Sequence, residues 1–155
     1  MNADKQKSRK PVMPPVYFLV TILLIAALHW LLPIMTLIDA PPKYVGLLVI
    51  GIGIIIVVVP ARAFETHATT IKPFEESDAL VTDGFYRITR NPMYLGMAIT
   101  LAGIAILFGT LAAFLPVPFF MIVIHRRFIL KEEAMLAVKF GDQFREYCNS
   151  VRRWI

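Results

Sequence analysis

Residues 89–96, with the sequence TRNPMYLG, place an arginine, an asparagine and a tyrosine at the edge of a long apolar stretch. Arg90 and Asn91 come directly before that stretch, and Tyr94 lies one helical turn further in. One interpretation is structural, because Asn is a favoured helix N-cap and Pro is favoured at the first helical position. The other is chemical, because the backbone N–H groups at a helix N-terminus can bind an anion.

Two carboxylates follow the other end of the same apolar stretch. Glu132 and Glu133 come soon after Arg126 and Arg127. Such a set is usually a surface group of ion pairs that contributes little stability. A carboxylate here can also meet a positively charged ligand. Adjacent helical residues point about 100° apart, so Glu132 and Glu133 are not expected to serve one ligand equally.

Other residues that often do chemistry show no suitable spacing. His29, His67 and His125 are far apart and do not form the pattern of a metal site, so no metal is expected. Cys148 is the single cysteine, which excludes an internal disulfide, and nothing beside it predicts a nucleophile.

The elements that must position these residues are membrane helices. The 155-residue chain is 57% hydrophobic and 17% charged, which is too apolar for an ordinary soluble domain. Three stretches, 14–35, 44–61 and 92–124, contain no Asp, Glu, Lys or Arg. A bilayer core about 30 Å thick needs roughly 20 helical residues. The first two stretches fit one crossing each, and the third fits a tight hairpin that turns at Gly109 and Thr110. We therefore expect an all-α, polytopic membrane protein with four transmembrane helices.

Basic residues set the expected orientation, since cytoplasmic segments are rich in Lys and Arg. They lie before the first apolar stretch, between the second and third, and after the last, and only Lys43 falls on the opposite side. Both termini are therefore expected to be cytoplasmic, in the inner membrane of the cell. The formal net charge of +5 is then attributed to topology and anionic lipid, and no nucleic-acid partner is expected.

The chain is expected to form one domain over residues 1–155. Its parts are a basic tail (1–12), a cytoplasmic loop (62–91) and a cytoplasmic C-terminal segment (126–155) with an amphipathic helix that stops near Gly141.

The order of motifs along the second half of the chain is specific. LVTDGFYRITRNPMYLG (80–96) is followed by the apolar hairpin, Glu132-Glu133, and finally FGDQFREYCNSVRRWI (140–155). This order resembles the isoprenylcysteine carboxyl methyltransferase family and the related phospholipid methyltransferases. Asn91 stands where that pattern has His, and Phe128 stands where carboxyl methyltransferases have a substrate-binding Arg, one residue after Arg127.

The resemblance implies transfer of a methyl group from S-adenosylmethionine to a lipophilic membrane acceptor. Arg127 becomes the candidate for binding that acceptor, and no acid or base is assigned. The positions implied for the cofactor are the following: Asp78, Ala79, Leu80, Val81, Tyr86, Asn91, Pro92, Met93, Tyr94, Glu132 and Glu133.

Two other functions remain open at this point. A membrane reductase related to the sterol reductases would share a similar C-terminal cofactor region but bind a nicotinamide cofactor. A non-catalytic lipid-binding module would keep the scaffold, and the loss of His at position 91 favours it.

Overall fold

The computed structural model describes residues 13–66 and 79–155, with the backbone alone for 63–66. The predicted basic tail and residues 67–78 of the predicted loop, which include Asp78, therefore lie outside the described residues.

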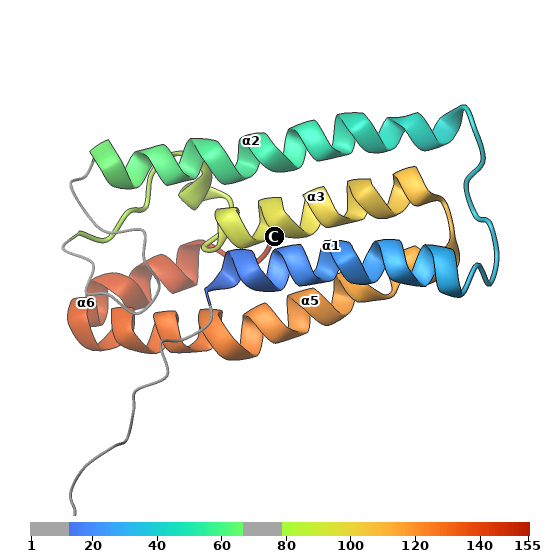
Figure 1. The fold of residues 1–155 in the computed structure, drawn as a ribbon. Coiled ribbons are helices and arrows are strands. Elements are labelled where there is room, and N and C mark those ends of the chain that lie inside the picture. The colour runs from blue at the N-terminus through green and yellow to red at the C-terminus, as the bar shows by residue number, and fades with distance from the viewer. Residues whose placement is uncertain (1–12, 67–78) are drawn as a thin grey trace, which may run out of the picture.

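Within the described ranges the chain is helical, with one isolated β-bridge between Thr36 and Thr110. Helices α1, α2, α3 and α5 run along a common direction (Figure 1). The elements in order are α1 (Pro14–Leu31), the 3-10 turn η1 (Pro42–Tyr44), α2 (Val45–Thr66), the 3-10 turn η2 (Gly84–Arg87), α3 (Pro92–Phe108), α4 (Leu111–Phe114), α5 (Pro116–Ile124), the π turn η3 (His125–Ile129) and α6 (Leu130–Ser150).

Three helical stretches are long and apolar enough to cross a membrane: Pro14–Leu31, Pro42–Arg62 and Leu111–Ser150. Helix α3 is also apolar but has only 17 residues, so the count of four crossings stays a prediction. The third stretch has 40 residues, which is about 60 Å of helix and twice the bilayer core. Its charged residues all follow Ile124. We therefore place α6 outside the membrane-spanning part.

Two boundaries differ from the sequence prediction. Helix α2 continues to Thr66, so Arg62 belongs to the helix and not to the predicted loop. The charge at Arg62 marks the end of the apolar surface, while the local residues still favour helix. The C-terminal segment does not begin as a separate helix either, because η3 joins α5 to α6 without a break.

Helices α2 and α3 touch through glycines that are seven residues apart in each helix. A Cβ atom on Gly96 would lie 2.7 Å from the carbonyl oxygen of Gly53, and one on Gly103 would lie 2.8 Å from that of Gly46. Small residues of this kind allow the backbones of membrane helices to approach closely. This contact fixes α3, and with it Tyr94, against α2.

The hairpin turns at Gly109 and Thr110, as the sequence predicted. Gly109 adopts φ +72° and ends α3, a conformation that glycine reaches without a steric penalty. Its carbonyl accepts hydrogen bonds from Leu37 and Ile38, while His29 pairs with the Thr110 hydroxyl at 3.1 Å. The connection between α1 and α2 therefore packs onto the hairpin turn.

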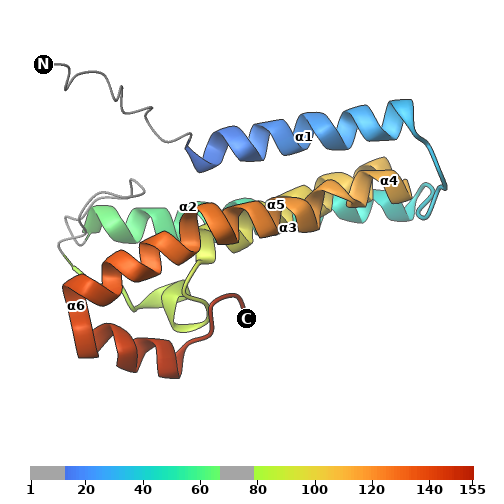
Figure 2. The ribbon, with the colours of Figure 1, turned by 90° about the horizontal axis from the view of Figure 1, so that it is seen from below.

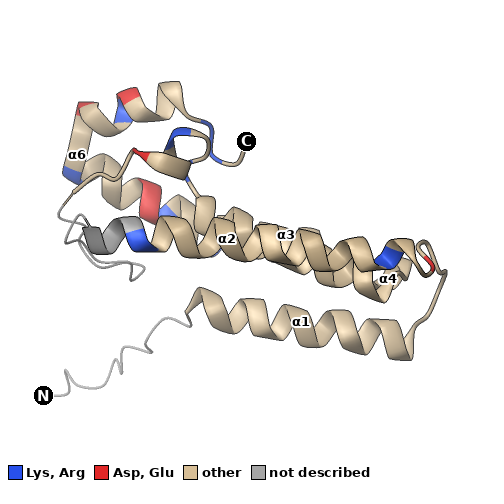
Figure 3. Cartoon of the chain, turned by 90° about the horizontal axis from the view of Figure 1, so that it is seen from above, with Lys and Arg blue, Asp and Glu red and all other residues tan. Residues whose placement is uncertain are grey.

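At the opposite end α6 bends sharply at Gly141 (φ 52°, ψ −119°) and folds back beside residues 79–91 (Figure 2). The charged residues of the described chain gather at this end (Figure 3), apart from Asp39 and Lys43. A first core cluster, which includes Tyr94, Phe120 and Phe128, lies within the bundle. A second one, made by Val81, Tyr86, Phe144, Tyr147 and Val151, lies between residues 79–91 and the end of α6.

Candidate active site

The two segments that carry the predicted site meet at the charged end of the bundle. The hydroxyl of Tyr94, in the first turn of α3, donates a hydrogen bond of 2.8 Å to Oε1 of Glu132 in α6. The partners are 38 residues apart and are separated by the whole hairpin. The convergence of Tyr94 and Glu132 that the motif order implied is thus present in the fold.

Glu132 is a half-buried carboxyl among aromatic residues. Burial raises its pKa above the ordinary value, the hydrogen bond from Tyr94 lowers it, and the nearby charge of Glu133 raises it again. Burial also raises the pKa of Tyr86 above its usual range, with further contributions from Tyr147 and Glu132. The negative charge of Glu132 on α6 therefore acts on the pKa of a loop residue.

An aromatic wall stands beside this carboxyl. The Phe128 ring is 2% exposed and lies 6.4 Å, centroid to centroid, from the ring of Tyr94. On its other side it meets Tyr17 of α1 edge-on at 5.6 Å. Arg127 is exposed and donates only a long hydrogen bond of 3.5 Å to the Tyr17 hydroxyl. The side chain at position 128 is therefore apolar and occupied in packing.

Asn91 does not cap α3 as the structural interpretation expected. It is the residue before the helix, but its side chain makes no capping hydrogen bond. Its Nδ2 donates instead to the carbonyl oxygen of Arg153 at 3.0 Å. The side chain is thus directed at residues 151–155, which we call the C-terminal strap. Next to it Pro92 is buried and Met93 half-buried.

The side chain of Glu133 contacts the strap. Its carboxylate accepts hydrogen bonds from Nε of Arg153 at 3.0 Å and from Nη2 of Arg153 at 2.7 Å. Nη2 of Arg90 lies 3.3 Å from the same group. Within the described chain, Nε of Arg90 is a buried donor with no hydrogen-bond partner.

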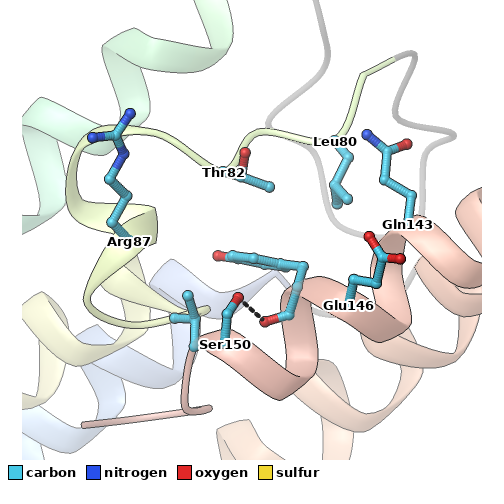
Figure 4. A pocket seen from close by; sticks show the side chains of 8 residues that line it. Leu80, Thr82, Arg87, Gln143, Glu146 and Ser150 are labelled. Atoms are coloured by element: carbon cyan, nitrogen blue, oxygen red, sulfur yellow. Dashed lines mark hydrogen bonds between the residues drawn. The ribbon is translucent and has the colours of Figure 1, made fainter.

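The loop residues surround an open cavity of about 610 Å³. Leu80, Thr82 and Arg87 form one wall, and the end of α6 forms the other with Gln143, Glu146 and Ser150 (Figure 4). Of the predicted cofactor residues that the structure describes, Leu80 alone lines this cavity. Val81 and Tyr86 lie in the second core cluster, and Ala79 is half-buried.

Tyr147, which lines the cavity, donates a buried hydrogen bond from its hydroxyl to the carbonyl oxygen of Tyr86 at 2.7 Å. Replacing Tyr147 by Phe leaves that carbonyl without its partner. We expect a loss of about 1–2 kcal/mol in the free energy of unfolding, measured by denaturation in detergent. Tyr44→Phe, at an exposed tyrosine, is the control and should unfold like the wild type. Equal stability of the two variants would contradict the assigned hydrogen bond.

Sequence reasoning did not single out Tyr17, Arg153 or Trp154. Tyr17 has a sequence signal, because an aromatic residue with a polar tip at the basic end of an apolar stretch is typical of a membrane interface. Arg153 and Trp154 were part of the final motif, but their contacts depend on the bend at Gly141. Among the described residues no group of three or more His, Cys, Asp or Glu side chains could hold a metal ion.

Comparison with known proteins places this arrangement in context. A family model described as "Phospholipid methyltransferase" matches residues 42–143. Protein-S-isoprenylcysteine O-methyltransferase A of Arabidopsis thaliana is 35% identical over 113 residues, which are 68% of this chain and 55% of that protein. An uncharacterized protein of Haemophilus influenzae is 40% identical over 63 residues, which are 41% of this chain and all of that protein.

A solved structure has a similar fold. The eukaryotic intramembrane Ras methyltransferase ICMT (isoprenylcysteine carboxyl methyltransferase) matches 99% of this chain and 54% of its own, with a TM-score of 0.63 and 22% identity. The chain thus spans little more than half the length of this enzyme and of the plant relative.

The fold and the site together define an all-helical integral membrane protein with a polar site at one end of an apolar helical hairpin. The chain belongs to the family of phospholipid methyltransferases and isoprenylcysteine carboxyl methyltransferases.

Proposed function

We propose that this chain is a methyltransferase that uses S-adenosylmethionine to methylate a lipophilic acceptor by in-line displacement at the cytoplasmic face of the membrane. The observation that carries the proposal is the hydrogen bond between Tyr94 and Glu132, which joins the two halves of the family motif across the hairpin. The matching family model and the isoprenylcysteine O-methyltransferase relative support it.

The residues around Glu132 suit such a cofactor. Its positive groups need a carboxylate, and Glu132 supplies one in a half-buried setting where an ionic contact is strong. Its own carboxylate needs donors. The buried Nε of Arg90 lacks an acceptor among the described residues, and the first turn of α3 has no side-chain cap. A helix N-terminus next to an unsatisfied arginine N–H is suited to an anion.

When bound, S-adenosylmethionine supplies an activated methyl group. The task left to the protein is mainly alignment of the acceptor with that group, which is the proximity contribution to catalysis. Tyr94, Phe128 and Tyr17 form an apolar wall that can exclude water from the reacting groups. No covalent intermediate on the enzyme is required, so Cys148 has no assigned part.

We place the charged end of the bundle in the cytoplasm, with four crossings and both termini on that side. The gathering of Lys and Arg at this end supports that orientation (Figure 3). A water-soluble cofactor then enters from the cytoplasm, while a lipophilic acceptor enters from the bilayer.

The packing of Phe128 bears on whether the acceptor group is a carboxylate or an amine. Phe128 is buried against two aromatic rings, which removes a cation from the place where a carboxyl methyltransferase would hold its substrate. Arg127 lies at the surface next to Tyr17 and is the proposed contact for an anionic part of the acceptor. An aromatic wall with no cation at position 128 suits an amine better than a carboxylate.

The test is to incubate membranes that contain the protein with methyl-labelled cofactor and then to extract the lipids. A labelled lipid supports the proposal, and membranes without the protein are the control. Alkaline treatment releases label from a methyl ester but not from a methylamine, so it identifies the acceptor group. No labelled lipid, combined with binding of NADPH and not of S-adenosylmethionine to the purified protein, would favour the reductase.

The raised pKa of Glu132 predicts a pH dependence of cofactor binding. As the pH falls through this raised pKa, the carboxyl gains a proton and loses the charge that meets the cofactor. We expect the affinity for S-adenosylmethionine to decline at a higher pH than an ordinary glutamate would cause. Calorimetric titration at several pH values measures this decline, which should be absent in Glu132→Gln. The same decline in that variant would assign it to another group.

A further inference from the structure

The carboxylate of Glu133 holds two arginines from distant parts of the chain. Arg153 binds it through Nε and Nη2, at 3.0 Å and 2.7 Å, which is the paired geometry of a strong arginine–carboxylate contact. Arg90 approaches the same carboxylate at 3.3 Å. The side chains of Arg90 and Glu133 are only 12% and 16% exposed. The carboxylate of Glu133 is therefore bound by two arginines of the chain itself. The resemblance to the family had given Glu133, like its neighbour Glu132, as a cofactor position.

The C-terminal strap is tied to the start of α3 by its backbone. The carbonyl oxygen of Arg153 accepts hydrogen bonds from the hydroxyl of Thr89 at 3.2 Å and from Nδ2 of Asn91 at 3.0 Å. The carbonyl oxygen of Arg152 accepts one from the backbone N–H of Arg90 at 3.0 Å. Trp154 packs against the first core cluster, which contains Tyr94. The strap thus contacts both the residues before α3 and the cluster that holds Tyr94.

We propose that Glu133 is a positioning residue: by holding Arg153 and Arg90 it locks the C-terminal strap across the start of α3 and keeps Glu132 within hydrogen-bond reach of Tyr94. Glu133 and Glu132 are neighbours on α6, so fixing one carboxylate fixes the rotation of the helix that carries the other. The proposal rests on the proposed function, because cofactor affinity is one of its readouts.

The side chains of Glu133 and Arg90 are 16% and 12% exposed and that of Arg153 is 36% exposed, so this contact is better shielded from water than an ordinary surface ion pair. Asp142 and Arg145 form a pair at 2.9 Å in the same helix, but their side chains are 87% and 77% exposed. Exposed pairs of this kind contribute little. Removing one partner of a buried pair leaves the other charge uncompensated. Asp142→Asn is therefore the matched control for Glu133→Gln.

The decisive measurement is a double-mutant cycle on the affinity for S-adenosylmethionine. We expect Glu133→Gln and Arg153→Ala each to weaken binding by about tenfold, and the double variant to be no weaker than either, because both act through one contact. Arg153→Lys, which keeps the charge and loses the paired geometry, should fall between the wild type and Arg153→Ala. If Glu133 instead contacts the cofactor, the two losses multiply, and that result overturns the proposal.

A spectroscopic readout tests the strap without any cofactor. In a Trp30→Phe background Trp154 is the single tryptophan. Glu133→Gln and Arg153→Ala should shift its emission to the red and increase its quenching by acrylamide, whereas Asp142→Asn should not.

Unchanged Trp154 signals overturn the positioning role alone. Altered Trp154 signals combined with wild-type affinity for S-adenosylmethionine also overturn only that role. If Glu133→Gln does not fold, wild-type affinity in Arg153→Lys overturns it. A wild-type protein that binds no cofactor overturns the proposed function and, with it, the positioning role.

Discussion

Glu132→Ala is expected to weaken binding of S-adenosylmethionine by about 100-fold. The variant removes the half-buried carboxylate that accepts the hydrogen bond from Tyr94 and that we propose to meet a positive group of the cofactor. A hydrogen bond to a charged partner contributes about 1.5–3 kcal/mol, and the larger value corresponds to that factor. Calorimetric titration of the purified protein measures the change.

Two further variants separate charge from shape at this position. Glu132→Gln keeps the size and an oxygen that can accept from Tyr94, so it should lose most of the affinity if charge is what matters. Tyr94→Phe keeps the carboxylate and loses its orienting partner, so its loss should be smaller. Asp142→Asn, at an exposed carboxyl of the same helix that does not line the cavity, is the control. Wild-type affinity in both Glu132→Ala and Tyr94→Phe would remove Glu132 from the cofactor site.

Gly96→Ala is expected to lower the free energy of unfolding by about 3 kcal/mol, the cost of forcing atoms into a filled core. The added Cβ would lie 2.7 Å from the carbonyl oxygen of Gly53 and 2.8 Å from the backbone nitrogen of Val57. Backbone atoms cannot move aside as a flexible side chain can, so α2 and α3 must separate. Thermal unfolding in detergent measures the loss.

The control for this variant is a glycine in the same pair of helices that faces open space. A Cβ on Gly51 would meet nothing within 4 Å. Gly51→Ala should therefore be as stable as the wild type or gain about 0.5–1 kcal/mol, because glycine is unfavourable within a helix. If Gly96→Ala and Gly51→Ala unfold at the same temperature, the helices do not pack through Gly96.

Some features of the fold follow from local sequence, and these were predictable. The turn at Gly109 needs a left-handed backbone, which the sequence signals with a glycine in the middle of an apolar stretch. The start of α3 at Pro92 follows from that proline, because proline is favoured at the first helical position. The meeting of Tyr94 and Glu132 was accessible through motif order, because a hairpin returns the chain to the end from which it left.

Other features depend on tertiary contacts that no local pattern encodes. Asn91 had the right type for a helix cap, yet the carbonyl of Arg153 competes for its side chain. The resemblance gave Glu133 as a cofactor position beside Glu132, and no local pattern indicates that the bend at Gly141 brings Arg153 back to its carboxylate. The sequence also placed the end of α2 too early, because loss of apolar character at Arg62 reports the membrane surface and not the helix end.

The π turn at His125–Ile129 bears on how relatives should be aligned with this chain. A π-type hydrogen bond spans one more residue than an α-type bond, so residues on the two sides of the turn share a face at spacings longer by one than in a regular helix. If only one of two relatives has the π turn, side chains in equivalent places can therefore lie at different numbers of residues from the glutamate pair. Matching such positions therefore requires the direction of each side chain around the helix axis as well as the residue count.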